Sequence, residues 1–150
     1  MRLYDTRTSL QTRWIVLASN PVLADTSALY ALISRVDVFH EAASKTYEGL
    51  LRGGREMWFS SYVLVEFSGL TERRLGFSPL KSFYDSVDGV FDTFWIDDQL
   101  HHEAWAQLET RNGAGLNFVD WTVMLAAREL GATIFTFDGG FRQEGAATLP

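Results

Sequence analysis

Short apolar runs alternate along this chain with longer stretches in which apolar residues recur every three or four positions. Short runs of this kind are typical of buried strands, and the longer spacing is typical of amphipathic helices. Strands are therefore predicted over residues 22–24, 57–59, 93–96 and 132–137. Helices are predicted between them, over residues 26–36, 39–51, 62–75, 80–90, 98–111 and 118–130.

Strands separated by helices favour parallel pairing, because a helical crossover returns the chain to begin the next strand in the same direction. The predicted fold class is therefore α/β, with one central parallel sheet of four or five strands flanked by helices. Residues 21–150 are predicted to form a single domain, since they contain no repeat and no linker-like segment. Residues 1–20 are interpreted as an N-terminal extension without an assigned role.

Composition narrows the possible chemistry. The chain is 47% apolar and 21% charged, as in an ordinary globular domain, and no run approaches the roughly 20 apolar residues that cross a bilayer. We therefore expect a soluble, cytoplasmic protein. The chain has no cysteine, which excludes thiol catalysis, disulfides and iron–sulfur clusters. The net charge of −6 disfavours a protein that coats nucleic acid through surplus positive charge, but it leaves nuclease chemistry open.

Several familiar catalytic motifs are missing. The chain has neither a G-x-x-x-x-G-K-[ST] phosphate loop nor a G-x-S-x-G serine-hydrolase elbow. Gly113-Ala114-Gly115 begins like a dinucleotide-binding fingerprint, but Phe118 occupies the third glycine position. His101 and His102 are adjacent, so on a helix they point in different directions and cannot form the i, i+4 pair of a zinc helix.

Acidic residues are the remaining candidates, and four of them fall near the ends of predicted strands or the starts of the helices that follow: Asp25, Glu66, Asp120 and Asp138. In a parallel sheet all carboxyl ends lie at one edge, where open α/β folds place their sites. Taken singly, three of these acids have simpler interpretations. Asp25 could cap a helix, Asp120 could close a capping box with Asn117, and Asp138 could be a turn residue.

Glu66 is the hardest of the four to explain as a local structural residue. It lies in an otherwise apolar stretch, and the positions three and four residues later, Gly69 and Leu70, could not pair with it. Clustered carboxylates repel one another and raise one another's pKa values, whereas a divalent cation reverses both effects. An oxygen-only site without cysteine or histidine suits Mg²⁺ or Mn²⁺. The residues therefore predict a metal site.

The motifs together resemble the PIN domain, and specifically the VapC-like toxin ribonucleases of bacterial and archaeal toxin–antitoxin pairs. The likeness spans about residues 22–141 and rests on the segments VLADTSAL (22–29), SYVLVE (61–66), LNFVD (116–120) and AARELGATIFTFDGGF (126–141). The resemblance implies that Asp25, Glu66 and Asp120 are acidic metal ligands and that Asp138 holds the fourth, more variable acidic position.

The resemblance also implies supporting residues. Thr26 or Ser27, with Asn117, would orient the carboxylates or a water. The residue after the third acid is often small in the family, whereas this chain has Trp121, which we expect to fill the core. RNA would be held by cations away from the acids, for which the candidates are Arg52, Arg55, Arg73 and Arg74.

The activity implied is Mg²⁺- or Mn²⁺-dependent hydrolysis of RNA phosphodiester bonds by an activated water. The partners implied are an RNA substrate, a second copy of the chain in a homodimer, and a cognate antitoxin protein. Two alternatives stand beside this interpretation. Aspartate-nucleophile phosphatases also place an acid after the first strand, but they need a second acid two positions later, where this chain has Ser27. The stronger alternative is a catalytically inactive PIN-like binding module.

Overall fold

The computed structural model describes residues 20–150, so the predicted extension, apart from Asn20, lies outside the described residues. Five strands form one sheet in the order β3-β2-β1-β4-β5, and every pairing is parallel. The strands are β1 (Val22–Ala24), β2 (Met57–Ser60), β3 (Phe91–Phe94), β4 (Thr133–Phe135) and β5 (Thr148–Leu149). The predicted α/β class with a parallel sheet of four or five strands is confirmed.

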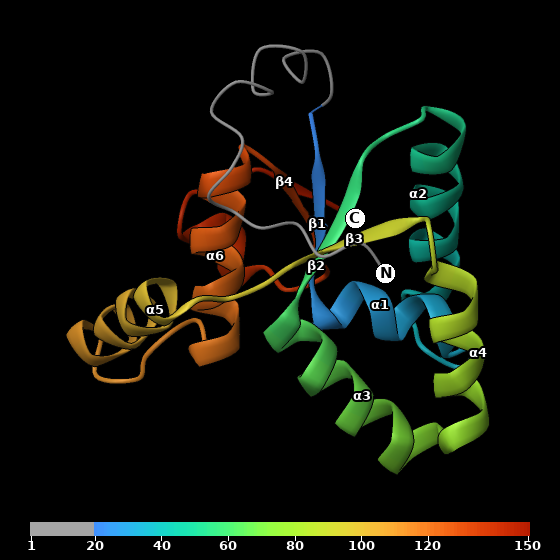
Figure 1. Ribbon diagram of the computed structural model, residues 1–150, viewed down its shortest axis with the longest axis horizontal. Coiled ribbons are helices and arrows are strands. Elements are labelled where there is room, and N and C mark those ends of the chain that lie inside the picture. The colour runs from blue at the N-terminus through green and yellow to red at the C-terminus, as the bar shows by residue number, and fades with distance from the viewer. Residues whose placement is uncertain (1–19) are drawn as a thin grey trace.

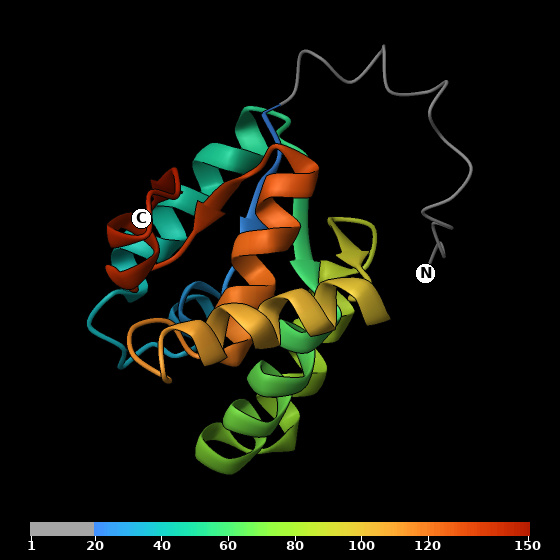
Figure 2. The same ribbon diagram turned by 90° about the vertical axis from the view of Figure 1, so that its left-hand side faces the viewer.

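Helices cover both sides of this sheet. They are α1 (Thr26–Ile33), α2 (His40–Arg52), α3 (Ser61–Leu75), α4 (Phe77–Val87), α5 (Asp98–Thr110), α6 (Phe118–Leu130) and α7 (Gly140–Gln143). In Figure 1, α6 and α2 lie on opposite sides of the sheet, and β1 and β2 run toward α1 and α3 at its lower edge. Figure 2 shows α6 lying along the sheet with α5 across its lower end. The carboxyl edge of the sheet is therefore the edge from which α1 and α3 extend.

Side-chain caps start the helices that follow the strands. Asp25 caps α1 by accepting from the amide of Ser27, and Ser60 caps α3 by accepting from the amide of Val63. These caps satisfy amides that have no partner within the helix, and they allow each strand to turn directly into a helix. The polar groups of the carboxyl edge are thus fixed by the backbone that precedes and follows them.

The hydrophobic core fills the space between the sheet and its helices. The largest fully buried side chains include Leu23, Phe67, Trp121, Phe135 and Phe141. The expected core position of Trp121 is confirmed. Burial of these large side chains is the main favourable contribution to folding, at about 1.5–3 kcal/mol for each aliphatic or phenylalanine side chain. The core therefore forms a rigid base beneath the carboxyl edge.

Two predicted elements near the middle of the chain, a helix and a strand, begin and end earlier than expected. The helix predicted over 80–90 is α4 and begins at Phe77, because Pro79 falls in its first turn, where the missing N–H has no partner within the helix. The strand predicted over 93–96 is β3 and ends at Phe94. Trp95 follows the strand and is 44% exposed, so it lies outside the core.

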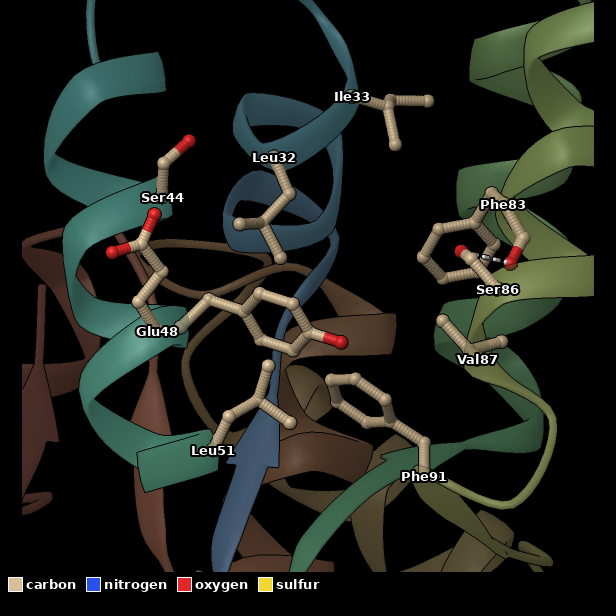
Figure 3. A pocket seen from close by; sticks show the side chains of 10 residues that line it. Leu32, Ile33, Ser44, Glu48, Leu51, Phe83, Ser86, Val87 and Phe91 are labelled. Atoms are coloured by element: carbon tan, nitrogen blue, oxygen red, sulfur yellow. Dashed lines mark hydrogen bonds between the residues drawn. The ribbon is translucent and has the colours of Figure 1, made fainter. Parts of the chain in front are cut away.

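A shallow apolar groove of about 340 Å³ opens between α1, α2, α4 and β3, and its lining includes Leu32, Tyr47, Phe83 and Phe91 (Figure 3). None of the four acids predicted as site residues lines it. The groove is therefore separate from the candidate chemistry. Among residues 20–150, no helix combines the length and apolar character needed to span a membrane.

Candidate active site

The four predicted acids gather at the carboxyl edge of the sheet. Asp25 directly follows β1, and Asp138 lies three residues after β4. Glu66 lies in the second turn of α3, the helix that follows β2, and Asp120 lies in the first turn of α6. Asp25, Glu66 and Asp138 are all near enough to Asp120 to raise its pKa. The parallel topology therefore brings together residues that are up to 113 positions apart in the sequence.

Asp25 is the most deeply buried of the four, with 3% of its surface exposed. Its Oδ2 accepts hydrogen bonds from Ser27 Oγ at 2.8 Å, from Ser27 N at 3.3 Å and from Thr136 Oγ1 at 3.0 Å. Burial raises the pKa of this carboxyl, and the hydrogen bonds from the two hydroxyl groups lower it only in part. The helix-capping role is confirmed, and it does not remove the cost of a buried charge.

Thr136 connects two of the acids, and sequence reasoning missed it. Its hydroxyl donates to Asp25 Oδ2 and accepts from the backbone N–H of Asp138 at 3.0 Å. Ser27 Oγ also accepts from the amide of Phe137 at 3.0 Å. The end of β4 is therefore fixed to the start of α1 by hydroxyl groups. The only available signal was a threonine two residues before an acid at a strand end, and threonine is common in strands.

Glu66 finds its partner on another helix, as its surroundings in the sequence required. Thr26 Oγ1 donates to Glu66 Oε2 at 2.6 Å, which joins α1 to α3 across the edge. The Glu66 side chain is half-buried. The predicted roles of Thr26 and Ser27 are thus divided, because Thr26 orients Glu66 and Ser27 orients Asp25.

Asp120 combines a structural and an electrostatic role. With Asn117 it forms a complete capping box: Asn117 N donates to Asp120 Oδ2 at 2.9 Å, and Asp120 N donates to Asn117 Oδ1 at 3.0 Å. The pKa of Asp120 is raised to about 7, chiefly by burial; the hydrogen bond from the Asn117 amide lowers it, and the negative charges of Asp25, Asp138 and Glu66 raise it. An aspartate that only capped a helix would have no other carboxylates beside it to raise its pKa.

Asp138 lies in the turn after β4 and is exposed. Its Oδ1 accepts from the amide of Gly140 at 2.7 Å, which confirms that Asp138 is a turn residue. Gly140 is restricted by close packing, because a Cβ there would meet a Leu116 methyl carbon at 2.9 Å and Asp138 Oδ1 at 3.1 Å. The packing of Gly140 against Leu116 thus connects the turn of Asp138 to the loop that precedes α6.

The donor set at this edge matches a hard divalent cation. All four side chains offer carboxylate oxygens, and within residues 20–150 their hydrogen bonds and ion pairs include none to lysine or arginine. Buried and mutually repelling carboxylates without a basic partner are stabilised by a metal ion. As positioned in the part of the chain that the structure describes, no three acidic or histidine side chains form a ready-made metal cage. Metal binding at this edge would therefore require the acidic side chains to move closer together.

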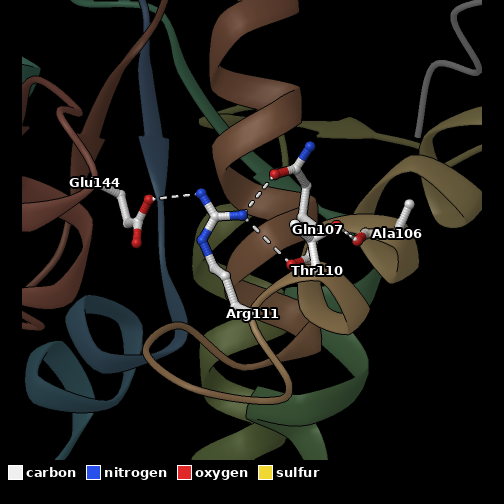
Figure 4. A network of polar contacts seen from close by, with 5 residues as sticks. All are labelled: Ala106, Gln107, Thr110, Arg111 and Glu144. Carbon is white, nitrogen blue, oxygen red and sulfur yellow. Dashed lines mark hydrogen bonds and ion pairs between the residues drawn. The ribbon is translucent and has the colours of Figure 1, made fainter.

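Arg111 packs against the residue that follows Asp120, and its hydrogen bonds and ion pairs within residues 20–150 include none to the four acids. The Arg111 guanidinium lies 4.2 Å from the ring centre of Trp121, the residue after Asp120. It also pairs with Glu144 at 3.1 Å and donates to Gln107 Oε1 at 2.8 Å (Figure 4). Arg111 therefore joins α5 and α6 to the segment after α7. The buried Trp121 side chain is packed against this guanidinium.

The four arginines expected to contact RNA separate into two pairs. Arg52 and Arg55 precede β2 and so lie at the amino end of that strand, away from the acids. Arg52 pairs with Glu48 at 2.9 Å, and Arg55 donates to the carbonyl of Asn20, which precedes β1. Arg73 and Arg74 close α3, the helix that carries Glu66. The structure brings only the second pair onto an element of the site.

A parallel α/β sheet with acids at its carboxyl edge belongs to the open α/β folds that place their sites at this edge, and the comparison with known families narrows that class. The model of the PIN domain family matches residues 22–145, which is most of the chain. The chain therefore belongs to the PIN domain family. No curated protein sequence matches it closely enough to count as a relative.

Solved structures share this fold. VapC20 from Mycobacterium tuberculosis, described as a sarcin–ricin loop cleaving toxin, is 24% identical with a TM-score of 0.75, covering 85% of this chain and 98% of its own. VapBC2 from Rickettsia felis, bound to a DNA fragment from its promoter, is 17% identical with a TM-score of 0.64, covering 86% of this chain and 96% of its own. DNA-bound VapBC from Salmonella typhimurium is 18% identical with a TM-score of 0.57, covering 87% and 96%. At these identities the likeness establishes the fold.

Proposed function

We propose that this protein is a Mg²⁺- or Mn²⁺-dependent endoribonuclease and the toxin of a VapBC-type pair. One observation carries the proposal: four carboxylates from separate elements lie at the carboxyl edge of the sheet, where burial and the negative charges of the other three raise the pKa of Asp120 to about 7. Proteins rarely gather buried like charges without a use for them, since each unpaired charge costs free energy. Membership of the PIN domain family supports a nuclease function for these acids.

In this proposal Asp25, Glu66, Asp120 and Asp138 hold the cation. Once bound, the cation would supply positive charge opposite the phosphate and make a nearby water more acidic. Ser27 and Thr136 hold the Asp25 carboxylate through its Oδ2. These hydroxyl groups fix the orientation of the Asp25 carboxylate before substrate binds, so this side chain need not reorient during hydrolysis.

Thr26 holds Glu66, and Asn117 holds Asp120, in the same way. Hydrolysis places water on the phosphorus and releases the RNA oxygen, so the protein forms no covalent bond to the substrate. The chain's own contribution is therefore to position carboxylates and to exclude basic side chains that would compete with the cation.

We further propose a homodimer and a cognate antitoxin as partners. The structural neighbours from Rickettsia felis and Salmonella typhimurium are themselves described as VapBC complexes, which supports an antitoxin. Self-association is supported by apolar side chains left in solvent on neighbouring helices, where Val65 is 75% exposed and Phe77 is 67% exposed. Sedimentation velocity with the purified chain would measure the oligomeric state, and a monomer at micromolar concentration would contradict the dimer.

The activity is tested by incubating single-stranded RNA with the wild type and with Asp25→Asn. We expect cleavage with Mg²⁺ or Mn²⁺, none in EDTA, and none by the variant even though its circular dichroism matches the wild type. Asp98→Asn, which changes an acid on the exposed surface of α5, is the matched control and should cleave normally. A folded wild type that leaves RNA intact with either metal would instead support the inactive binding module.

A further inference from the structure

A second pair of side chains continues the line of contacts that begins with Thr26 and Glu66. Tyr30 lies four residues after Thr26 on α1, and Arg74 lies eight residues after Glu66 on α3. Residues four apart share a face of a helix, and Arg74 lies two such steps beyond Glu66. The Arg74 guanidinium lies over the Tyr30 ring, 5.7 Å from its centre. The boundary between α1 and α3 thus runs from an acid–hydroxyl contact to an arginine–tyrosine contact.

Arg74 is held by an aromatic ring and not by an acid. Within the described residues its hydrogen bonds and ion pairs include none to a carboxylate, and its side chain is exposed. A guanidinium held over the face of a ring uses no N–H donor in that contact, so the five donors in the guanidinium plane stay available to other acceptors. In a chain of net charge −6, an arginine that is positioned but left without an anionic partner is suited to binding an anion from outside.

The distance along α3 matches a polynucleotide strand. Eight residues of α-helix separate Arg74 from Glu66 by about 12 Å along the axis, which a nucleic-acid strand covers in a few nucleotides. A strand with one phosphate at the acids would therefore present a later phosphate to Arg74. The segment from Asp85 to Glu103 is unsuited to binding phosphates, because it contains six acids and neither lysine nor arginine.

From these contacts we infer that Tyr30 and Arg74 form a phosphate-binding site for the RNA strand that flanks the cleaved bond, an inference that rests on the proposed function. Arg74 contacts a backbone phosphate, and Tyr30 is a positioning residue that holds the guanidinium over the boundary between α1 and α3. The contact is with the backbone, so it is independent of base sequence. It sets the affinity for substrate and leaves the hydrolytic step to the acids.

The inference is tested by binding of a fluorescein-labelled, 20-nucleotide, random-sequence single-stranded RNA in Mg²⁺. The Asp25→Asn background is used to prevent cleavage, and affinity is measured by anisotropy at several salt concentrations. We expect Arg74→Met to lower affinity and to reduce the slope of log affinity against log salt by about 0.7, the value for one phosphate contact on a single strand. Tyr30→Phe should bind like the background protein, because it keeps the ring.

Arg128→Met is the matched control. Arg128 is also an exposed arginine in the last turn of a helix, α6, so it shares any favourable interaction of Arg74 with a helix C-terminus. Its replacement should leave the salt slope unchanged. Tyr30→Leu should weaken binding, but should add nothing in a protein that already carries Arg74→Met, since the tyrosine acts through the arginine.

The outcomes separate this inference from the proposed function. If the wild type cleaves RNA with Mg²⁺ but Arg74→Met binds with the same affinity and salt slope as Arg128→Met, the inference alone is overturned. The same holds if Tyr30→Leu weakens binding equally with and without Arg74. A protein that neither cleaves nor binds RNA overturns both. Loss of affinity and slope in Arg74→Met, with Arg128→Met unchanged, supports the phosphate site.

Discussion

Replacing Asp120 by asparagine should stabilise the metal-free protein, and the gain should grow with pH. Asp120 is 7% exposed, and its pKa is raised from 3.8 to about 7 by burial and by three neighbouring carboxylates. Between these two values the folded chain holds a proton that the unfolded chain releases. The free energy of unfolding therefore falls as pH rises through this window.

The size of the effect follows from the rise in pKa. A rise of about three pH units corresponds to about 4 kcal/mol of destabilisation once the folded carboxyl is fully ionised, at about 1.4 kcal/mol for each unit. About 3 kcal/mol of this develops between pH 5 and pH 8. Asparagine carries no charge and keeps an oxygen that can accept from the amide of Asn117, so Asp120→Asn avoids the penalty without losing the cap.

The assay is urea unfolding in EDTA at pH 5 and pH 8, followed by circular dichroism. The variant's advantage in unfolding free energy over the wild type should increase by about 3 kcal/mol from the lower to the higher pH. Asp85→Asn serves as the control, because it removes an exposed charge whose partner, Lys81, keeps its proton at both pH values, and its difference from the wild type should stay constant. An Asp120→Asn protein that is less stable than the wild type at pH 8 would refute the reasoning.

Three smaller predictions concern the support of the site and are all read out by urea unfolding at pH 7. Thr136→Val should cost about 1–3 kcal/mol, because it removes one of the donors to the buried Asp25 carboxylate and the acceptor of the Asp138 amide. Thr71→Val removes a buried hydroxyl that has no hydrogen-bond partner among the described residues, so it should be neutral or stabilising. Equal costs for the two variants would contradict the role of Thr136. Arg111→Met should cost about 1 kcal/mol through the lost contact with Trp121, and no change would show that the contact is incidental. Ser60→Ala should cost about 1 kcal/mol by removing a helix cap, which an unchanged midpoint would disprove.

The alternation of apolar runs and helical spacing predicted four of the five strands, because a buried parallel strand carries a continuous apolar signal. It missed β5, which has only two residues and therefore no apolar run. The position of the acids followed from topology, since Asp25 and Asp138 come after strands that end at the same edge. The same rule would have placed Arg55 at the opposite edge, because it precedes β2. The boundaries of α4 were wrong because Pro79 signals a break in a helix interior and is tolerated in a first turn.

Contacts between distant segments could not be predicted from local pattern. Thr136 looks like an ordinary strand residue, and only the folded chain brings its hydroxyl to Asp25, 111 positions away. The contact of Arg111 with Trp121 likewise depends on how α5 packs against α6. Glu66 was the one residue whose sequence surroundings indicated a distant contact, because an acid in an apolar stretch needs a partner from elsewhere. Thr26 is that partner.

The account depends most on joint binding of a divalent cation by acids from separate elements. Isothermal titration of Mn²⁺ at pH 8 tests this directly, with the wild type, Asp25→Asn, Glu66→Gln, Asp120→Asn and the surface control Asp98→Asn. We predict that the wild type and the control bind Mn²⁺ with equal affinity and that each of the other three loses most of it. A folded wild type that binds no Mn²⁺, or site variants that bind as tightly as the control, would contradict the account.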